Sequence, residues 1–393
     1  MDETPEDFAL HVLYVCHEYP PAATGGIGPS VRTLARGIAR MGHRASVVGF
    51  YSEPLVEDDH GVTVYRVRPT KTVRFIHWLL MRRQLRREIL AIHARDPIDV
   101  IEWPDYEGWF WRPLPQVANV LKVHGTNMSH RLHGLGRRKR LIEWLELRTL
   151  RRLRNWIGVS AWFNSEWRQI ANVKPAHETV VYNPVDPELF KPSDHRRQPG
   201  LVMYAGGLKR RKGVLALARA ARIFLKRVPG SQLLLVGAPA DLTPQQVCSE
   251  AGDMAGRIKF VPHVSQAELV KYLASATVYA MPSLYESCGN TWIEAMSCQT
   301  PVVGSWLSCG PEIVEHERTG LLSDPNQPEQ IAANVMHLLN NPDRARAMGR
   351  AGRQRVLDRF AIDVAAKTSL LFYKQCANVD FAHKRPASTL GIR

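Results

Sequence analysis

The sequence predicts an α/β protein with two domains, each built on a doubly wound parallel sheet, and three observations support this. The chain has 393 residues, which is too long for one compact core and fits two domains of about 100–200 residues. A strand, a glycine-rich loop and a helix follow one another from residue 10. The same order begins again at Leu201, as expected where a second sheet of this kind starts.

The first domain is expected to open with a strand at 10–16, because this run is continuously apolar and such runs are typical of strands buried on both faces. A glycine-rich loop at 25–28 follows, and apolar residues then recur at helical spacing as far as Met41. Residues 45–50 predict the next strand. This strand–helix–strand order is the first repeat of a Rossmann-like unit.

The second domain repeats that order through a loop at Gly206 and Gly207 and a helix that begins near Gly213. Further strands are predicted at 232–236, 259–261, 278–281 and 301–303. The predicted first domain is 1–190 and the second is 201–358, with a polar linker containing two prolines at 191–200 between them. A helix is predicted at 359–378, where it caps the second domain or crosses back to the first. Residues 379–393 are predicted to form a flexible tail. We expect the two domains to face a cleft.

Charge and cysteine content limit the classes of protein to consider. The net charge of +15 favours anionic partners, such as nucleic acid, a membrane surface or phosphorylated small molecules. The six cysteines form no C-x-x-C pair, which favours a reducing compartment over a disulfide framework. The acidic N-terminus lacks the layout of a signal peptide, and no apolar run approaches the roughly 20 residues of a spanning helix. These features predict a soluble cytoplasmic protein.

Two glycine loops are candidate phosphate sites, because backbone N–H groups are free where a helix begins. Gly25–Gly26 and Gly206–Gly207 both occupy such positions, although neither completes a dinucleotide or P-loop motif, and tight turns for packing remain an alternative. Four cations at 209–212 crowd the start of the second helix. They oppose the helix dipole, so they indicate either an anionic ligand or solvated surface charge.

The stretch "YESCGNTWIEAMS" places Glu286 and Glu294 on either side of a glycine-polar turn. Glu286 follows a predicted strand, and Asn290 is the expected N-cap of the next helix. Because ligands bind outside the carboxyl ends of strands in such sheets, both acids could contact one ligand. Carboxylates accept hydrogen bonds from hydroxyls. One acid could hold a sugar and the other a ribose, with the helix N-terminus between them for a diphosphate.

An ordered set of motifs carries a family resemblance. "ESCGNTWIEAMS" followed by "TPVV" resembles the E-x7-E signature of the retaining glycosyltransferases of family 4, which have the GT-B fold. "KVHG", "VYNPVD", "YAGGLKRRKGV", "PEIVEHERTGLL" and "RFAIDVAAK" are similar to family motifs and stand in the expected order. The resemblance extends from about residue 10 to 378.

The resemblance implies a role for each matching residue. Glu286 is expected to hold hydroxyls of the transferred hexose, Glu294 the nucleotide ribose, and Lys212 the diphosphate. His124 is expected near the reacting sugar. The remaining substrate contacts are expected from Gly25, Gly26, Ile27, Asn183, Gly206, Gly207, Arg211, Cys288, Gly289, Asn290 and Thr291.

The chain departs from the family pattern at three places. Gly207 stands where the family usually has an arginine that grips the diphosphate, and Arg210 or Arg211 is a candidate replacement. Gln299 replaces the glycine that usually ends the signature helix, which predicts a non-glycine residue with positive φ. Ser308 and Cys309 stand where a glycine pair is common.

The reaction implied is transfer of a hexose-type sugar from a UDP- or GDP-linked donor to a glycan or lipid-linked acceptor. The sequence contains no D-x-D triplet, so Lys212 and a helix N-terminus are expected to replace a metal ion, and no cofactor is expected. An epimerase of the same fold is an alternative that needs no acceptor. A phosphorylase would need a pyridoxal lysine site, and a nucleic-acid-binding protein would explain the charge but not the signature.

Two arginine-rich stretches, 74–95 and 131–154, lie in the first half of the chain. Basic helices with apolar residues suit an anionic membrane surface, and Trp78, Phe75 and Leu79 could add insertion. A helix packed on the core with a solvated arginine face is the alternative. Peripheral attachment to the cytoplasmic face of a membrane would agree with a lipid-linked acceptor.

Overall fold

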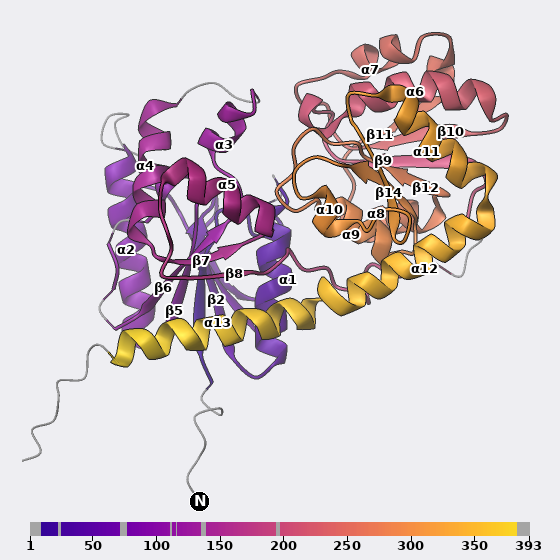
Figure 1. Cartoon of the computed structure of the whole chain (residues 1–393). Coiled ribbons are helices and arrows are strands. Elements are labelled where there is room, and N and C mark those ends of the chain that lie inside the picture. Colours follow the sequence, from indigo (N-terminus) through magenta and orange to yellow (C-terminus); the bar gives the residue numbers. More distant parts are fainter. Residues whose placement is uncertain are drawn as a thin grey trace, which may run out of the picture. The chain divides into compact units, whose positions relative to one another are not determined.

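The computed structural model describes residues 9–22, 25–70, 77–110, 112–114, 116–134, 139–193 and 197–382, with side chains as far as Ala377. The chain forms two compact units, shown in Figure 1. The N-terminal unit comprises the chain through Val159, Asn164–Val181 and the chain from Ile362 onward. The C-terminal unit comprises Ser160–Phe163 and Tyr182–Ala361.

The first sheet has eight strands among the described residues, in the order β3-β4-β2-β1-β5-β6-β7-β8. Neighbouring strands are parallel except for the β3–β4 pair, which is antiparallel. The strands are β1 (His11–Val15), β2 (Arg44–Phe50), β3 (Leu55–Asp58), β4 (Val62–Val67), β5 (Val100–Pro104), β6 (Ala118–Val123), β7 (Asn155–Gly158) and β8 (His177–Val180).

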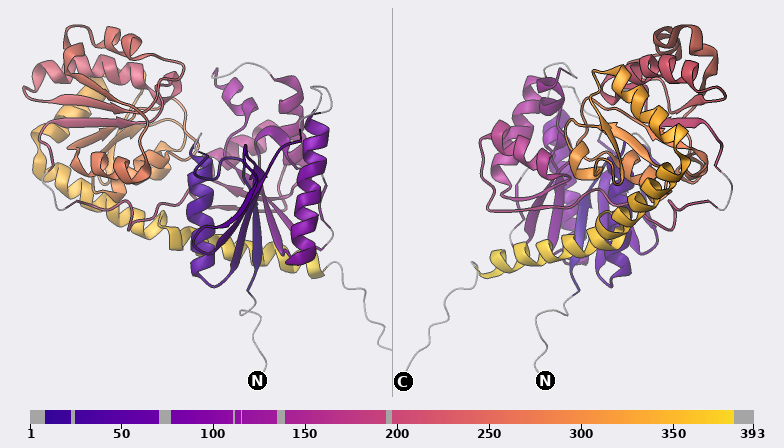
Figure 2. Two further views of the ribbon diagram at one scale, coloured as in Figure 1. Left: turned by 180° about the vertical axis from the view of Figure 1, so that it is seen from behind. Right: turned by 45° about the vertical axis from the view of Figure 1, so that its right-hand side comes forward.

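Helices cover both faces of this sheet, and Figure 2 shows α1 and α2 on opposite sides of it. The helices of the unit are α1 (Ile27–Arg40), α2 (His77–Arg95), the 3-10 turn η1 (Tyr106–Gly108), α3 (Asn127–Leu132), α4 (Arg140–Arg152), α5 (Ala161–Ala171) and α13 (Ile362–Ala382). The first residues of α5 group with the C-terminal unit, because Glu312 accepts hydrogen bonds from the N–H groups of Ala161 and Trp162.

The last helix, α13, packs on the N-terminal unit rather than on the unit that precedes it in the chain. It contacts α1 and β6, and the Tyr373 hydroxyl donates to the buried carboxylate of Glu102 over 2.5 Å. Gly37 of α1 allows close contact, because a Cβ at this position would lie 2.8 Å from a side-chain carbon of Ile362. The helix therefore supplies part of the core of the first unit.

The second sheet has six strands among the described residues, all parallel, in the order β11-β10-β9-β12-β13-β14. They are β9 (Leu201–Ala205), β10 (Gln232–Val236), β11 (Ile258–Val261), β12 (Val278–Ala280), β13 (Val302–Ser305) and β14 (Gly320–Ser323). Each of the strands predicted in this domain is found within one or two residues of its expected bounds, whereas β14 was not predicted.

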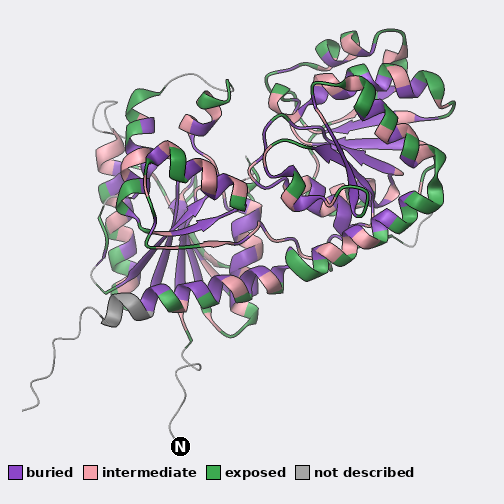
Figure 3. Ribbon diagram, viewed as in Figure 1, coloured by how far each residue is buried: buried purple, intermediate pink, exposed green. Residues whose placement is uncertain are grey.

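The helices of the C-terminal unit alternate with its strands. They are η2 (Arg210–Lys212), α6 (Val214–Arg227), α7 (Pro244–Ala251), η3 (Gly252–Arg257), α8 (Gln266–Ser275), α9 (Asn290–Ser297), α10 (Gly310–Ile313), α11 (Pro328–Asn340) and α12 (Pro342–Arg359). Figure 3 shows that the central strands of both sheets are buried, while the helices present exposed outer faces. The edge strands β3 and β8 contain no buried residue. None of the described helices combines the length and apolar character needed to cross a membrane.

The boundary between the units differs from the predicted one. The chain enters the C-terminal unit at Tyr182, and the predicted linker 191–200 lies inside that unit. The segment after Tyr182 is tied to the second unit because Asn183 donates its N–H to the Cys288 sulfur and Arg353 donates to the Phe190 carbonyl. Hydrogen bonds of this kind are not visible in a polar, proline-containing sequence.

Both sheets have a topological switch point, where the strand order reverses. In the first sheet it lies between β1 and β5, and in the second between β9 and β12. The carboxyl ends of strands beside a switch point form the usual ligand-binding edge of an open α/β sheet. These two edges hold most of the residues that the sequence singled out.

Candidate functional site

Glu286 and Lys212 form an ion pair at the switch point of the second sheet. Glu286 follows β12 and is only 7% exposed. The Lys212 ammonium donates to its Oε1 atom over 2.9 Å, and the Ser283 hydroxyl donates over 3.2 Å. Arg211 lies 3.5 Å from the same oxygen. Burial by itself would raise the pKa of Glu286, but Lys212 and Arg211 outweigh it and lower that pKa below its ordinary value.

Lys212 reaches this position because the turn before α6 is unusually close to the end of β12. Gly213 has φ of +70°, and a Cβ at this residue would lie 1.8 Å from the Pro282 carbonyl oxygen. Only glycine fits both the left-handed conformation and the contact. The sequence "KG" therefore fixes the lysine beside the strand that delivers Glu286.

A third cation, Lys209, lies beside Gly207, the position at which the family pattern has an arginine. A Cβ on Gly207 would lie 3.4 Å from the Lys209 side-chain Cε. Burial, then Arg211 and Lys212, lower the pKa of Lys209. Arg210 differs from these residues: it is exposed, and its backbone N–H donates to Asp241. Of the two candidate replacements, Arg211 is the one that lies beside Glu286.

Glu294 lies in α9 and has the opposite electrostatic state from Glu286. Its Oε2 atom is buried and has no hydrogen-bond partner among the described residues. Burial raises the pKa of Glu294 to about 8, although Lys212 acts in the other direction. Lys212 therefore interacts with both glutamates of the signature, one ionised and one largely protonated at neutral pH.

The start of α9 differs from the prediction in one detail. Gly289, with φ of +66°, is the N-cap, and no side chain caps the helix. The predicted cap, Asn290, is the first helical residue, and its Oδ1 accepts a hydrogen bond from the Asn183 amide over 2.9 Å. Thr291 donates its hydroxyl to the Met281 sulfur over 3.5 Å. The α9 amides are thus left without a side-chain cap, as a ligand-binding helix N-terminus requires.

Asn183 and Cys288 support the loop that carries Glu286. The Asn183 N–H lies 3.3 Å from the Cys288 sulfur, and both residues are buried. At the other end of α9, Gln299 has φ of +59°, so the predicted positive φ at a non-glycine residue is confirmed. Ser308, at the first of the two positions where a glycine pair is common, also has positive φ, of +57°.

The glycine loop of the first sheet leads directly into α1. Gly26 is the N-cap, Ile27 is the first helical residue, and no side chain caps the helix. A Cβ on Gly25 would lie 2.8 Å from the carboxylate of Glu18, and one on Gly28 would lie 1.7 Å from the Glu18 carbonyl oxygen. The glycines are needed because the end of β1 passes so close to the start of α1.

His124 follows β6 on the carboxyl edge of the same sheet. It is buried, and burial, followed by the charge of Lys122, lowers its pKa to about 3, so the ring is neutral at neutral pH. Asp105 follows β5, and its Oδ2 accepts the Gly125 N–H over 3.0 Å. Burial raises the pKa of Asp105 to about 7. The sequence reading missed Asp105, although it follows a buried strand in "VIEWPD", the same signal that identified Glu286.

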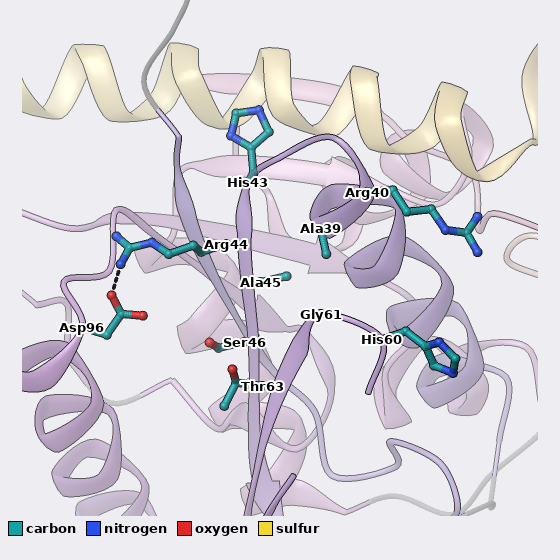
Figure 4. A pocket seen from close by; sticks show the side chains of 10 residues that line it. All are labelled: Ala39, Arg40, His43, Arg44, Ala45, Ser46, His60, Gly61, Thr63 and Asp96. Carbon is teal, nitrogen blue, oxygen red and sulfur yellow. Dashed lines mark hydrogen bonds and ion pairs between the residues drawn. The ribbon is translucent and has the colours of Figure 1, made fainter. Parts of the chain in front are cut away.

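Other features of the described chain lie outside this edge. A pocket of about 270 Å³ opens near the amino end of β2, and its lining contains none of the predicted site residues (Figure 4). Within it Arg44 forms an ion pair with Asp96. No group of three or more histidine, cysteine, aspartate or glutamate side chains suited to a metal ion occurs among the residues the structure describes.

The arginine-rich stretches are only partly surface features. Arg82 of α2 is buried and donates to the Phe110 carbonyl over 2.6 Å. Trp78 packs on Trp109, with ring centroids 4.9 Å apart. The interpretation of Arg82 as a surface charge is therefore wrong, because it lies beside the buried stripe of its helix. Residues Arg74, Phe75, Arg137 and Arg138 lie outside the described part of the chain.

Comparisons with known proteins agree with this arrangement. Residues 24–189 match the family described as Glycosyltransferase Family 4, and residues 185–355 match the family described as Glycosyl transferases group 1. An uncharacterized glycosyltransferase of Methanocaldococcus jannaschii is 28% identical over 93% of this chain and 98% of its own length.

Solved structures give the same fold. A sucrose-phosphate synthase from Thermosynechococcus elongatus superimposes with a TM-score of 0.79 at 22% identity, covering 94% of this chain and all of the other. HepE of Anabaena, solved in complex with UDP, superimposes with a TM-score of 0.71 at 17% identity, covering 93% of this chain and all of the other.

Proposed function

We propose a specific reaction for this chain from the premise that it belongs to the family 4 glycosyltransferases and has the GT-B fold. The reaction is transfer of a hexose from a nucleoside diphosphate sugar to an acceptor hydroxyl, with retention of the anomeric configuration. The observation that supports it most directly is the Glu286–Lys212 pair beside Arg211. A carboxylate and two cations at one edge suit a ligand with both hydroxyls and phosphates.

The cations suit the charge that develops in this reaction. When the bond between the sugar C1 and the diphosphate oxygen breaks, its electron pair stays on the phosphate. Lys212, Arg211 and Lys209 are in position to stabilise that charge, an effect worth several kcal/mol when the cations are fixed in advance. The acceptor hydroxyl attacks C1 from the face that the diphosphate leaves, and its proton passes to the departing phosphate oxygen. Glu286 accepts hydrogen bonds from the sugar hydroxyls.

The two sheet edges differ in charge, which supports different tasks. The edge with Glu286 carries three cations, whereas His124 on the first sheet is neutral at neutral pH. We assign the nucleotide sugar to the C-terminal unit, with Glu294 next to the ribose, and the acceptor hydroxyl to the N-terminal unit. UDP is the first nucleotide to test, because HepE was solved with it. The absence of a D-x-D triplet from the sequence supports transfer without a divalent metal ion or other cofactor.

A test of this function uses purified protein and a panel of UDP- and GDP-hexoses. A true donor should raise the melting temperature, because a ligand that binds only the folded state stabilises it, and it should be hydrolysed slowly without an acceptor. Proton NMR of the first product should show the same anomeric configuration as the donor. An inverted product would reject retention, and conversion of the donor to its epimer without transfer would identify an epimerase.

We also propose that the acceptor is lipid-linked and that α4 contacts an anionic membrane surface. This helix exposes Leu141 (61%) and Trp144 (57%), and Arg140 and Arg151 flank them. Basic helices with exposed tryptophan and leucine bind at anionic interfaces, at about 1 kcal/mol per basic residue near the surface. Vesicles with phosphatidylglycerol should sediment the protein at low salt, and Arg140→Gln with Trp144→Ser should reduce this binding.

The control variant is Arg350→Gln, an exposed arginine on α12 in the other unit. This variant also removes one positive charge, but from a helix outside the proposed membrane-binding surface. Its retention on the vesicles should therefore match that of the wild type. If the wild type ignores anionic vesicles at low salt, the acceptor is soluble and α4 has another partner.

A further inference from the structure

A second pocket in the N-terminal unit has the composition of an anion site and lies away from the proposed active edge. Its volume is about 600 Å³, and Asn119, Asn155 and His177 line it. These residues stand at the amino-terminal ends of β6, β7 and β8. His124 stands at the opposite, carboxyl end of β6, so the pocket is not part of the edge described above.

The charge of this pocket is positive and unbalanced. Arg152 and Arg154 line it at the junction of α4 and β7, and no aspartate or glutamate occurs among the lining residues whose side chains the structure describes. Arg148, one turn before Arg152, has a pKa that is lowered by burial first and then by Arg152 and Arg112. The neighbouring acid Glu178 is engaged by Arg168 over 2.6 Å. An anion would relieve this crowding of like charges.

The pocket of Figure 4 provides a contrast within the same unit. There the lining arginine Arg44 is neutralised by Asp96. A surface pocket with an arginine is therefore not in itself a ligand site. The pocket beside α4 differs because the described part of its lining offers its cations no carboxylate, and Arg154 donates only to a backbone carbonyl, that of Lys174.

The asparagine amides of the wall already donate to backbone carbonyls, Asn119 to Val117 over 2.8 Å and Asn155 to Asn119 over 3.2 Å, so donors for a ligand come from the arginines and His177. The Gln375 side-chain amide nitrogen lies 3.2 Å from Nδ1 of His177, and when Nδ1 accepts this hydrogen bond the Nε2–H group is left as a donor. The side-chain oxygen of Asn119 already accepts the Trp103 indole N–H over 2.9 Å. One acceptor of the wall is thereby occupied, and the arginines and the His177 Nε2–H group supply donors.

We propose that this pocket binds a phosphate monoester through Arg152, Arg154 and His177. Guanidinium groups bind phosphate with paired N–H donors, and a dianion with three terminal oxygens can satisfy two arginines and an imidazole at once. The volume exceeds that of a phosphate group, so the pocket also accommodates the group to which the phosphate is esterified. The site is independent of the proposed sugar transfer.

Inorganic phosphate is the first probe, and His177 is the reporter. The full-length protein is labelled with ¹⁵N-histidine, and phosphate replaces chloride at constant pH and ionic strength. The His177 ring resonances, assigned with His177→Gln, should shift and saturate. Arg152→Gln should weaken the apparent affinity about 10- to 100-fold, as expected for one lost hydrogen bond between charged groups. Arg350→Gln, at an exposed arginine of α12 that is not part of the lining, should leave it unchanged.

Vesicles separate the two possible sources of the phosphate monoester. Phosphatidate exposes a monoester and phosphatidylglycerol a diester, so a lipid ligand should give stronger retention on phosphatidate vesicles, and Arg152→Gln should abolish the difference. A soluble ligand should give the phosphate response without that difference. The proposal fails if His177 responds to neither probe, or if Arg152→Gln responds as the wild type does.

Discussion

Replacing Lys212 by methionine tests the central ion pair of the site, because it removes the charge and keeps most of the side-chain volume. The Lys212 ammonium lies 2.9 Å from the Glu286 carboxylate, and Glu286 is 7% exposed. After the substitution the carboxylate stays buried without its nearest cation. We expect a less stable C-terminal unit and a protein that transfers sugar about 100- to 1,000-fold more slowly, as when one charge-stabilising donor is lost.

The magnitude follows from the surroundings of Glu286. Breaking a buried ion pair by removing one partner costs about 3–5 kcal/mol. Here the loss should be smaller, about 1–3 kcal/mol, because Arg211 and the Ser283 hydroxyl still contact the carboxylate.

The sign with pH is the sharper test. In the wild type the pKa of Glu286 lies below its ordinary value. The ion pair therefore stabilises the protein when the pH is above the ordinary pKa of a glutamate, and this stabilisation is lost as the pH falls through the pKa of the folded state. In Lys212→Met the largest lowering influence is gone and burial remains, so the Glu286 pKa should rise. The difference in stability between the two proteins should therefore be larger at pH 7.5 than at pH 4.5.

Urea unfolding at both pH values measures this difference. The control is Lys226→Met, at an exposed lysine of α6. It also removes one positive charge, and it should change the free energy of unfolding by less than about 0.5 kcal/mol. The double variant Lys212→Met with Glu286→Gln should recover part of the loss, because no buried charge is left. A stability difference that is equal at the two pH values would refute the reasoning.

Three further outcomes are expected. Gly213→Ala should destabilise the protein by more than about 2 kcal/mol in chemical unfolding, because its Cβ meets the Pro282 carbonyl, whereas Gly230→Ala, with positive φ but open space, should cost only about 1 kcal/mol. In wild type, the raised pKa of Glu294 should make stability fall as pH rises from about 5 to 8, contributing up to about 1.4 kcal/mol per pH unit, and Glu294→Gln should reduce the slope by this contribution in the same assay, leaving that of Asp105. Initial transfer rates should persist in excess EDTA, and activity that is lost and then restored by Mg²⁺ or Mn²⁺ would contradict transfer without a metal.

The sequence was informative where periodicity and local motifs determine structure. The apolar runs predicted strands that the structure contains, and the local pattern correctly placed Glu286 in the loop at the carboxyl end of a strand. The positive φ of Gln299 was also predicted, because a glycine position leaves a conformational requirement when another residue fills it. Each of these predictions depends on a few consecutive residues.

Features that depend on distant contacts could not be predicted. The boundary at Tyr182 is set by bonds such as that from Arg353 to the Phe190 carbonyl, far away in the sequence. Arg82 illustrates the limit for helices, since it directly follows the buried Met81 and is itself buried, whereas the pattern assigned it to solvent.

The two units use one topology for two electrostatic environments. At each switch point a buried carboxyl follows a central strand, but the groups that hold it differ. Asp105 accepts a backbone N–H and has a pKa raised to about 7 by burial, whereas Glu286 is held ionised by Lys212 and Arg211. An edge whose carboxyl is held by a backbone N–H group suits hydroxyl recognition, and an edge with surplus cations suits a diphosphate. The division of labour that we propose therefore follows from what surrounds each carboxyl, since the strand order around it is of the same kind in both sheets.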